Sequence, residues 1–188
     1  EGLGEGRQLY DDPLNLRVAQ VSARVEAEGY CKWTRVEEIC KFALGMGFTK
    51  VGIACCISFV DQARVFSAIL ESHGLEVASA ACKTGGVPKE DIGLEDAEKI
   101  RPGNFEAMCN PITQAELLNR AGRQLNVIMG LCVGHDSLFI RHPLVLLGQE
   151  GVAHPKHPVL HAEDEHRQQR GLLVPRRQRG HREARGQP

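Results

Sequence analysis

The stretch that decides the fold is Lys-Val-Gly-Ile-Ala-Cys at residues 50–55. It is short, apolar and partly β-branched, which is typical of a strand buried inside a parallel sheet. A helix is predicted next, at residues 61–72 with Asp61 as its cap, and Gly74 suits the left-handed residue after it. Residues 75–81 form the next predicted strand. Strand, helix and strand make one βαβ unit, which indicates an α/β fold with parallel strands.

Helical patterns flank this unit on both sides. Upstream, residues 14–28 carry apolar side chains every three or four positions, and a second helix begins at Thr34, where Glu37 completes a capping box. Downstream, the pattern predicts a helix that opens at Asn110-Pro111 with Ile112, Ala115, Leu118 and Ala121 inward, strands at residues 126–131 and 144–147, and the start of a helix at residues 134–140. We therefore expect one α/β domain with a mainly parallel sheet flanked by helices, in a Rossmann-like three-layer arrangement.

The composition divides the chain into unlike parts. All seven cysteines and all nine aromatic residues lie within residues 10–139, whereas residues 142–188 hold six of the eight histidines. Residues 1–141 carry 15 basic and 19 acidic side chains, a net charge of -4, and residues 142–188 carry 8 and 5, a net of +3. We expect a flexible N-terminal segment at residues 1–13, the α/β domain at residues 14–141 and a disordered basic tail at residues 142–188.

Two origins of this tail stay open. Its bias toward His, Arg, Gln, Pro and Gly is typical of a frameshift or a join to foreign sequence near His142. The alternative is a native disordered tail that binds nucleic acid, but its arginines lack interleaved aromatic residues, so we do not expect base stacking.

The overall composition excludes some classes of protein. The chain has 42% hydrophobic and 25% charged residues, which are globular values, and no run of 18 apolar residues that would span a membrane. The net charge of -1 gives no general attraction to nucleic acid. An odd number of cysteines without a secretion signal favours reduced thiols or metal ligands in the cytoplasm. The chain begins at Glu1 without Met, so we expect it to be a fragment.

Four cysteines fall where the predicted strands end or a helix begins. Cys56 follows the first strand, Cys82 the second and Cys132 the third, while Cys109 precedes the helix that opens at Asn110. Because parallel strands end at one edge of the sheet, we expect these thiols to share that edge. His135 follows Cys132 by three residues, so the sequence predicts metal ligands at Cys56, Cys82, Cys109, Cys132 and His135.

Three interpretations of this edge stay open. The leading one is a metal centre, with zinc held by Cys and His or an iron–sulfur cluster held by four thiolates. The second is a thiol enzyme, with Cys132 as the nucleophile activated by a helix N-terminus and by His135. The third is a small-molecule-binding module with inert buried cysteines, for which Lys83 and Asn110 are the candidate cofactor-binding residues. The sequence leaves the oligomeric state open.

The remaining three cysteines are explained without a functional site. Cys31 and Cys40 lie on or near predicted helices and are expected to be small buried apolar residues, and Cys55 fits either packing or the site. Asp136 is expected to cap the turn after His135, although it can also orient the imidazole.

Several phrases carry a family resemblance: Thr-Arg-Val-Glu-Glu-Ile at residues 34–39, Cys82-Lys83, Met-Cys-Asn-Pro-Ile at 108–112 with Gln-Ala-Glu-Leu-Leu-Asn at 114–119, and Gly-Leu-Cys-Val-Gly-His-Asp-Ser-Leu-Phe at 130–139. Over about residues 10–140 the chain resembles the prokaryotic domain-of-unknown-function 1847 family, often labelled "metal-binding protein". The resemblance implies a cytoplasmic α/β protein with thiol-based metal binding and no known reaction. Members look as if they begin with a Cys-rich segment, which is missing here, and carry a single Cys after the first strand, matched here by Cys56 with Cys55 as an extra.

Overall fold

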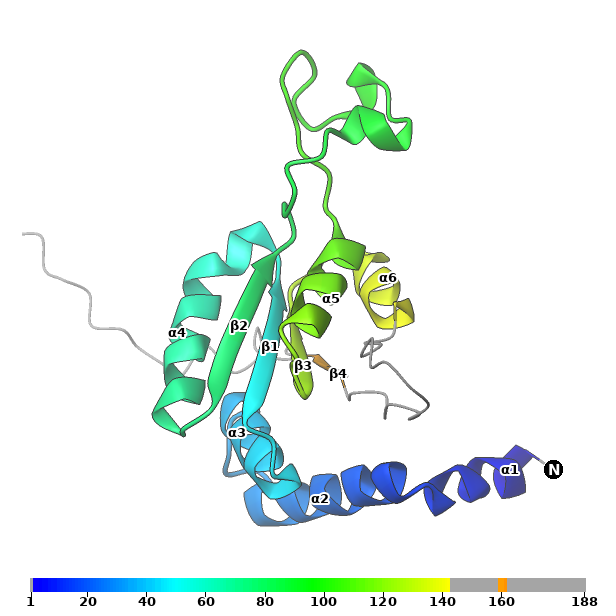
Figure 1. The fold of residues 1–188 in the computed structure, drawn as a ribbon, viewed down its shortest axis with the longest axis vertical. Coiled ribbons are helices and arrows are strands. Elements are labelled where there is room, and N and C mark those ends of the chain that lie inside the picture. Colours follow the sequence, from blue (N-terminus) through cyan, green and yellow to red (C-terminus); the bar gives the residue numbers. More distant parts are fainter. Residues whose placement is uncertain (1, 143–158, 162–188) are drawn as a thin grey trace, which may run out of the picture.

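The computed structural model describes residues 2–142 and 159–161, which form helices around a parallel sheet (Figure 1). The strands are β1 (Lys50–Cys55), β2 (Glu76–Ala81), β3 (Leu125–Met129) and β4 (Val159–His161). Their order in the sheet is β2-β1-β3-β4, and all neighbours are parallel. This is the start of the flavodoxin-like order of doubly wound folds, in which ligands bind at the carboxyl end where the connections reverse, between β1 and β3.

Helices cover both faces of the sheet. They are α1 (Gly2–Gln8), α2 (Pro13–Gly29), α3 (Arg35–Met46), α4 (Val60–Ser72), α5 (Pro111–Arg120) and α6 (His135–Arg141), with short 3₁₀ turns η1 (Leu9–Asp11), η2 (Ile57–Phe59), η3 (Lys89–Ile92) and η4 (Asp96–Glu98). One apolar cluster joins α2, α3 and α4 to residues such as Ile53 and Val127, and a second joins α5 and α6 to Ala54 and Ile128. Successive strand residues thus face opposite layers. The expected three-layer α/β arrangement is confirmed.

The helix caps follow the sequence in most places. The Thr34 side chain accepts a hydrogen bond from the Glu37 amide at 3.3 Å, and Asn110 caps α5 by accepting from the Thr113 amide at 3.1 Å. The prediction for Asp61 was wrong, because α4 begins one residue earlier with Phe59 in the cap position. Asp61 lies in the first turn and pairs with Arg64 on the surface instead.

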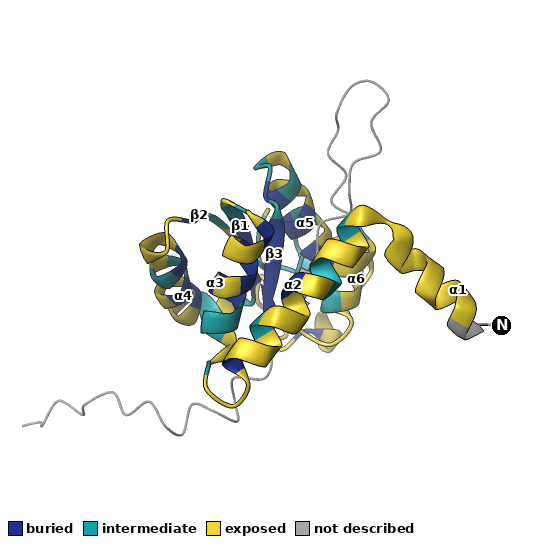
Figure 2. Ribbon diagram, turned by 90° about the horizontal axis from the view of Figure 1, so that it is seen from below, coloured by how far each residue is buried: buried dark blue, intermediate teal, exposed yellow. Residues whose placement is uncertain are grey.

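Both ends of the chain differ from the expected pattern. Residues 2–11, for which no helix is predicted, form α1 and η1, and residues 4–11 are exposed (Figure 2). The predicted strand at residues 144–147 lies outside the described residues. Within the expected tail, β4 pairs with β3, so three of its residues belong to the sheet. The division into residues 1–13, 14–141 and 142–188 remains a prediction.

None of the helices in the described part of the chain has the length and apolar character needed to cross a membrane.

Candidate metal centre

The carboxyl ends of β1, β2 and β3 bring four thiols together. Cys56 contacts the thiols of Cys82 and Cys132, and Cys109 also contacts both of them. We call Cys56, Cys82, Cys109 and Cys132 the four-thiol cluster. The contacts close a loop, and its members come from four separate segments of the chain. The cluster lies at the point between β1 and β3 where the connections of the sheet reverse, as expected for a ligand site in this topology.

His135 adds an imidazole to this cluster. One ligand atom each of Cys109, Cys132 and His135 lies within 4.8 Å of the other two. His135 is the first residue of α6, and its amide donates to the Cys132 carbonyl at 2.9 Å, which ties the histidine to the cysteine. Its Nδ1 is buried and has no hydrogen-bond partner among the described residues. Because buried polar atoms are normally paired, this nitrogen is suited to a ligand.

The surroundings give the thiols different acidities. Burial raises the pKa of Cys82 to about 12, against the lowering effect of the Ile57 amide, which donates to its Sγ at 3.3 Å. Burial also raises the pKa of Cys132, and the neighbouring thiols Cys109 and Cys56 raise it further. Burial acts in the same direction on Cys56, but hydrogen bonds from Ser58, Cys82 and Cys132 outweigh it, so its pKa is lowered.

The role of Cys132 as a nucleophile remains a prediction. Desolvation by burial and the adjacent thiols Cys109 and Cys56 raise its pKa, which does not favour the thiolate. The structure instead gives the lowered pKa to Cys56. The Asp136 Oδ1 accepts a hydrogen bond from the Ser137 amide at 2.7 Å, within the first turn of α6.

The other cysteines lie outside the cluster. Cys40 is fully buried in the core, as predicted, and burial raises its pKa. Cys55 is buried on the α3 and α4 side of the sheet, with its Sγ 3.9 Å from the Ala80 carbonyl oxygen, so it serves packing. The prediction for Cys31 was wrong, because it is exposed in the turn after α2 with a φ of 57°.

Lys83 and Asn110, the candidate cofactor-binding residues, have structural partners. The Lys83 Nζ donates to the Ala107 carbonyl at 2.6 Å, and the Asn110 side chain caps α5. Their role in binding a cofactor remains a prediction.

Gln114, to which the sequence analysis gave no role, binds the strand ends that carry the four-thiol cluster. Gln114 is fully buried on α5, and its Nε2 donates to the carbonyls of Cys55 and Ala80 at 3.1 and 2.6 Å. These are the last carbonyl of β1 and the next-to-last carbonyl of β2, just before the thiol-bearing loops. Ile112, which was expected inward, is instead 37% exposed. Helical spacing from Leu118 back to Gln114 was the available signal, but a polar residue at that position hid it.

Comparison with known proteins assigns the chain to a family. Residues 2–146 match the model of DUF1847, described as a protein of unknown function. The chain belongs to the DUF1847 family. The chain is also 47% identical over 133 residues to the uncharacterised protein MJ0455 of Methanocaldococcus jannaschii, a match that covers 71% of this chain and 67% of that protein. No solved structure gave a significant match. The expected family is thereby confirmed, and its name assigns no activity.

Proposed function

We propose that this DUF1847 protein binds a single metal ion through Cys109, Cys132 and His135, with Cys56 as the fourth ligand. The observation that carries the proposal is the convergence of the first three residues within 4.8 Å, with a buried imidazole nitrogen left unpaired. Cys56 suits the fourth position because it contacts Cys132 and its pKa is lowered, which favours the thiolate that a metal needs.

Zinc is the ion that this donor set fits best. Zinc takes thiolate and imidazole ligands in a tetrahedron with bonds of about 2.0 to 2.3 Å, so neighbouring ligand atoms stand about 3.5 to 3.8 Å apart. The ligand atoms of Cys109, Cys132 and His135 lie within 4.8 Å of one another, so only a small contraction brings these three to this geometry. An iron–sulfur cluster also uses four thiolates, but four thiolates alone would leave no role for the His135 imidazole that converges on Cys109 and Cys132.

The test is metal analysis of protein purified without oxygen, followed by substitution of cobalt for zinc. We expect one zinc per chain and a cobalt spectrum typical of tetrahedral thiolate ligation. Cys132→Ser is expected to lose the metal, whereas Cys31→Ser, at an exposed cysteine outside the cluster, is expected to retain it. A broad absorption near roughly 400 nm in the fresh protein would indicate an iron–sulfur cluster instead. Absence of metal from the unsubstituted protein would refute the proposal.

A second candidate function is thiol chemistry at Cys56. The observation that favours it is the lowered pKa of this thiol beside neighbours whose pKa is raised. The test is alkylation of metal-free protein at neutral pH, in which Cys56 is expected to react before Cys132. Equal, slow labelling of both residues would exclude an activated thiol and favour a module that binds a small molecule without covalent chemistry.

We also propose that the protein is cytoplasmic. All seven of its cysteines are free, and reduced thiols persist in that compartment.

A further inference from the structure

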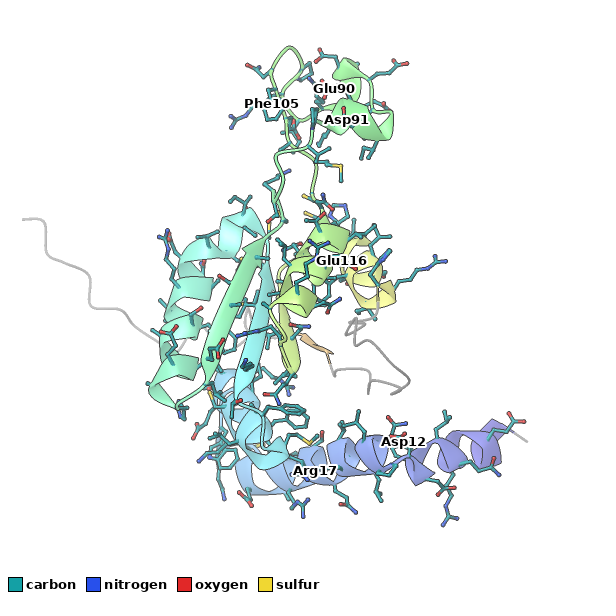
Figure 3. The ribbon with its side chains drawn as sticks, in the orientation of Figure 1. Asp12, Arg17, Glu90, Asp91, Phe105 and Glu116 are labelled. Carbon is teal, nitrogen blue, oxygen red and sulfur yellow. The ribbon has the colours of Figure 1, made fainter. Side chains whose placement is uncertain are left out.

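The chain between β2 and α5 forms an arm that projects from the carboxyl edge of the sheet (Figure 1). We define the arm as residues 83–108. It leaves the domain directly after Cys82 and returns directly before Cys109, so a member of the four-thiol cluster lies at each side of its neck. The arm contains η3 and η4, and Glu90, Asp91 and Phe105 lie on it (Figure 3).

The arm has no apolar core. Within residues 83–108, all of which the structure describes, Lys99 alone is buried, whereas Ile92, Ile100 and Phe105 are exposed. The Lys99 Nζ contacts Glu90 and Asp96 at 2.7 Å each and donates to the Asn104 carbonyl at 2.6 Å. A polar network therefore holds the arm together internally. Neither apolar cluster of the domain includes any of its residues, so its position depends on the neck.

The neck is closed by hydrogen bonds and by thiols. Four hydrogen bonds join its two sides: Asn110 amide to Cys82 carbonyl at 2.7 Å, Lys83 Nζ to Ala107 carbonyl at 2.6 Å, Met108 amide to Val87 carbonyl at 2.8 Å, and Lys89 amide to Glu106 carbonyl at 3.0 Å. The side chains of Lys89 and Glu106 also form an ion pair. Single hydrogen bonds stabilise a structure only modestly because water competes for both partners. Cys82 is buried against the domain, but Cys109 is half-buried, and its side chain lies among Cys82, Cys132 and His135.

We propose that the metal ion fixes the arm: an ion held by Cys109, Cys132 and His135 closes the neck, and loss of the ion allows the neck to open. The inference rests on the metal site proposed above. Metal bonds would join the returning side of the neck to the loop after β3 and to α6, which are packed on the sheet through Leu131 and Phe139. The ion would thereby control the placement of the exposed Ile100 and Phe105.

The size of the effect follows from mass action. If zinc binds the closed neck and not the open one, free zinc at about 100 times its dissociation constant reduces the open population about 100-fold. Amide hydrogen exchange reports that population directly. The informative amides are those of Met108 and Lys89, which bond across the arm to Val87 and to Glu106.

The experiment compares the full chain with zinc and with a chelator, under reducing conditions, by hydrogen exchange. We expect exchange at Met108 and Lys89 to slow about 100-fold with zinc, while the amides of β3 change much less. Elemental analysis of the same samples measures bound zinc. Bound zinc with unchanged exchange at the neck, or with equal slowing in β3, would overturn the inference and leave the metal site intact. Absence of bound zinc would overturn both proposals.

Two variants and one control make the result specific. Cys109→Ser is expected to remove the zinc dependence of exchange at the neck. His135→Gln removes a ligand without altering the neck itself, so it tests the same inference if Cys109→Ser does not fold. Cys31→Ser is expected to retain the full effect. Undiminished zinc dependence in His135→Gln would overturn the proposed coupling.

Discussion

Gly130→Ala tests whether close packing between two loops positions the thiols. Gly130 directly follows β3, two residues before Cys132, and its φ is +59°. A Cβ at this position would lie 2.5 Å from Cε2 and 2.7 Å from Cδ2 of Phe59, which belongs to η2 after Cys56. The glycine therefore lets the two loops approach each other at the site.

The expected cost has two parts. A left-handed backbone costs an alanine about 1 to 2 kcal/mol, and forcing a methyl group against a packed ring costs about 1 to 3 kcal/mol. Gly122→Ala is the matched control, because Gly122 has a similar φ of +64° but no atom within 4 Å of its added Cβ. Gly122 precedes β3 and lies at the opposite end of that strand from Cys132. We therefore expect Gly130→Ala to be about 1 to 3 kcal/mol less stable than Gly122→Ala.

Urea unfolding of both variants, with reductant and chelator present, measures this difference. Zinc affinity, measured by competition with a chelating dye, is expected to fall about 10- to 100-fold in Gly130→Ala, as for groups that orient metal ligands, and to stay unchanged in Gly122→Ala. Equal stability of the two variants would refute the packing argument. Phe59→Leu should restore part of the stability to Gly130→Ala, because the smaller side chain can move away from the methyl group.

Three further predictions concern other parts of the molecule. Hydrogen bonds from Lys99 lower the pKa of Asp96 and of Glu90 in the folded arm. These carboxylates therefore stabilise the arm fully above their pKa in the unfolded chain, about 4, and this stabilisation is lost as the pH falls through their lower pKa values in the folded arm. Hydrogen exchange of the arm amides, corrected for intrinsic rates, should accelerate below about pH 4, and unchanged protection at about pH 2 would contradict this prediction. Gln114→Leu removes two buried hydrogen bonds and should lower the free energy of unfolding by about 1 to 3 kcal/mol in urea titrations, whereas a neutral result would show that the carbonyls find other partners. Phe139→Ala leaves a cavity where a side chain only 1% exposed now packs, and should cost about 3 to 5 kcal/mol by the same measurement; a loss below about 1 kcal/mol would mean that α6 contributes little to the core.

The layers and the strand-end thiols could be predicted because both follow from periodicity. A short apolar run such as Lys50–Cys55 predicts a buried parallel strand, and neighbouring parallel strands end at the same edge of the sheet. That rule alone brought Cys56, Cys82 and Cys132 to the same place. The inward face of α5 was harder, because a buried Gln114 has no hydrophobic signal and is explained only by the carbonyls that it meets.

The arm could not be predicted, for a physical reason. Its structure depends on Lys99 and the acceptors around it rather than on apolar spacing, so no helix or strand pattern in the sequence indicated it. The acidities of the thiols were equally hidden, because the raised pKa of Cys132 arises from neighbours that are distant in sequence. Pairing of β4 with β3 depends on a partner more than 30 residues away, which local patterns do not report.

The tandem cysteines after β1 have a consequence for how the protein tolerates change. Cys55 faces the layer of α3 and α4, and Cys56 faces the layer of α5, because adjacent strand residues point to opposite sides. An insertion of one residue before β1 that moved the strand by one position would put Cys55 in the place of Cys56, and Ala54 in the place of Cys55. A thiol would then still occupy the corner of the cluster, even though Val51 and Ile53 would lose their places in the core. Such an insertion would reduce the stability of the domain and still leave a thiol among the candidate metal ligands. Stability and metal binding can therefore be lost separately by changes in this stretch of the chain.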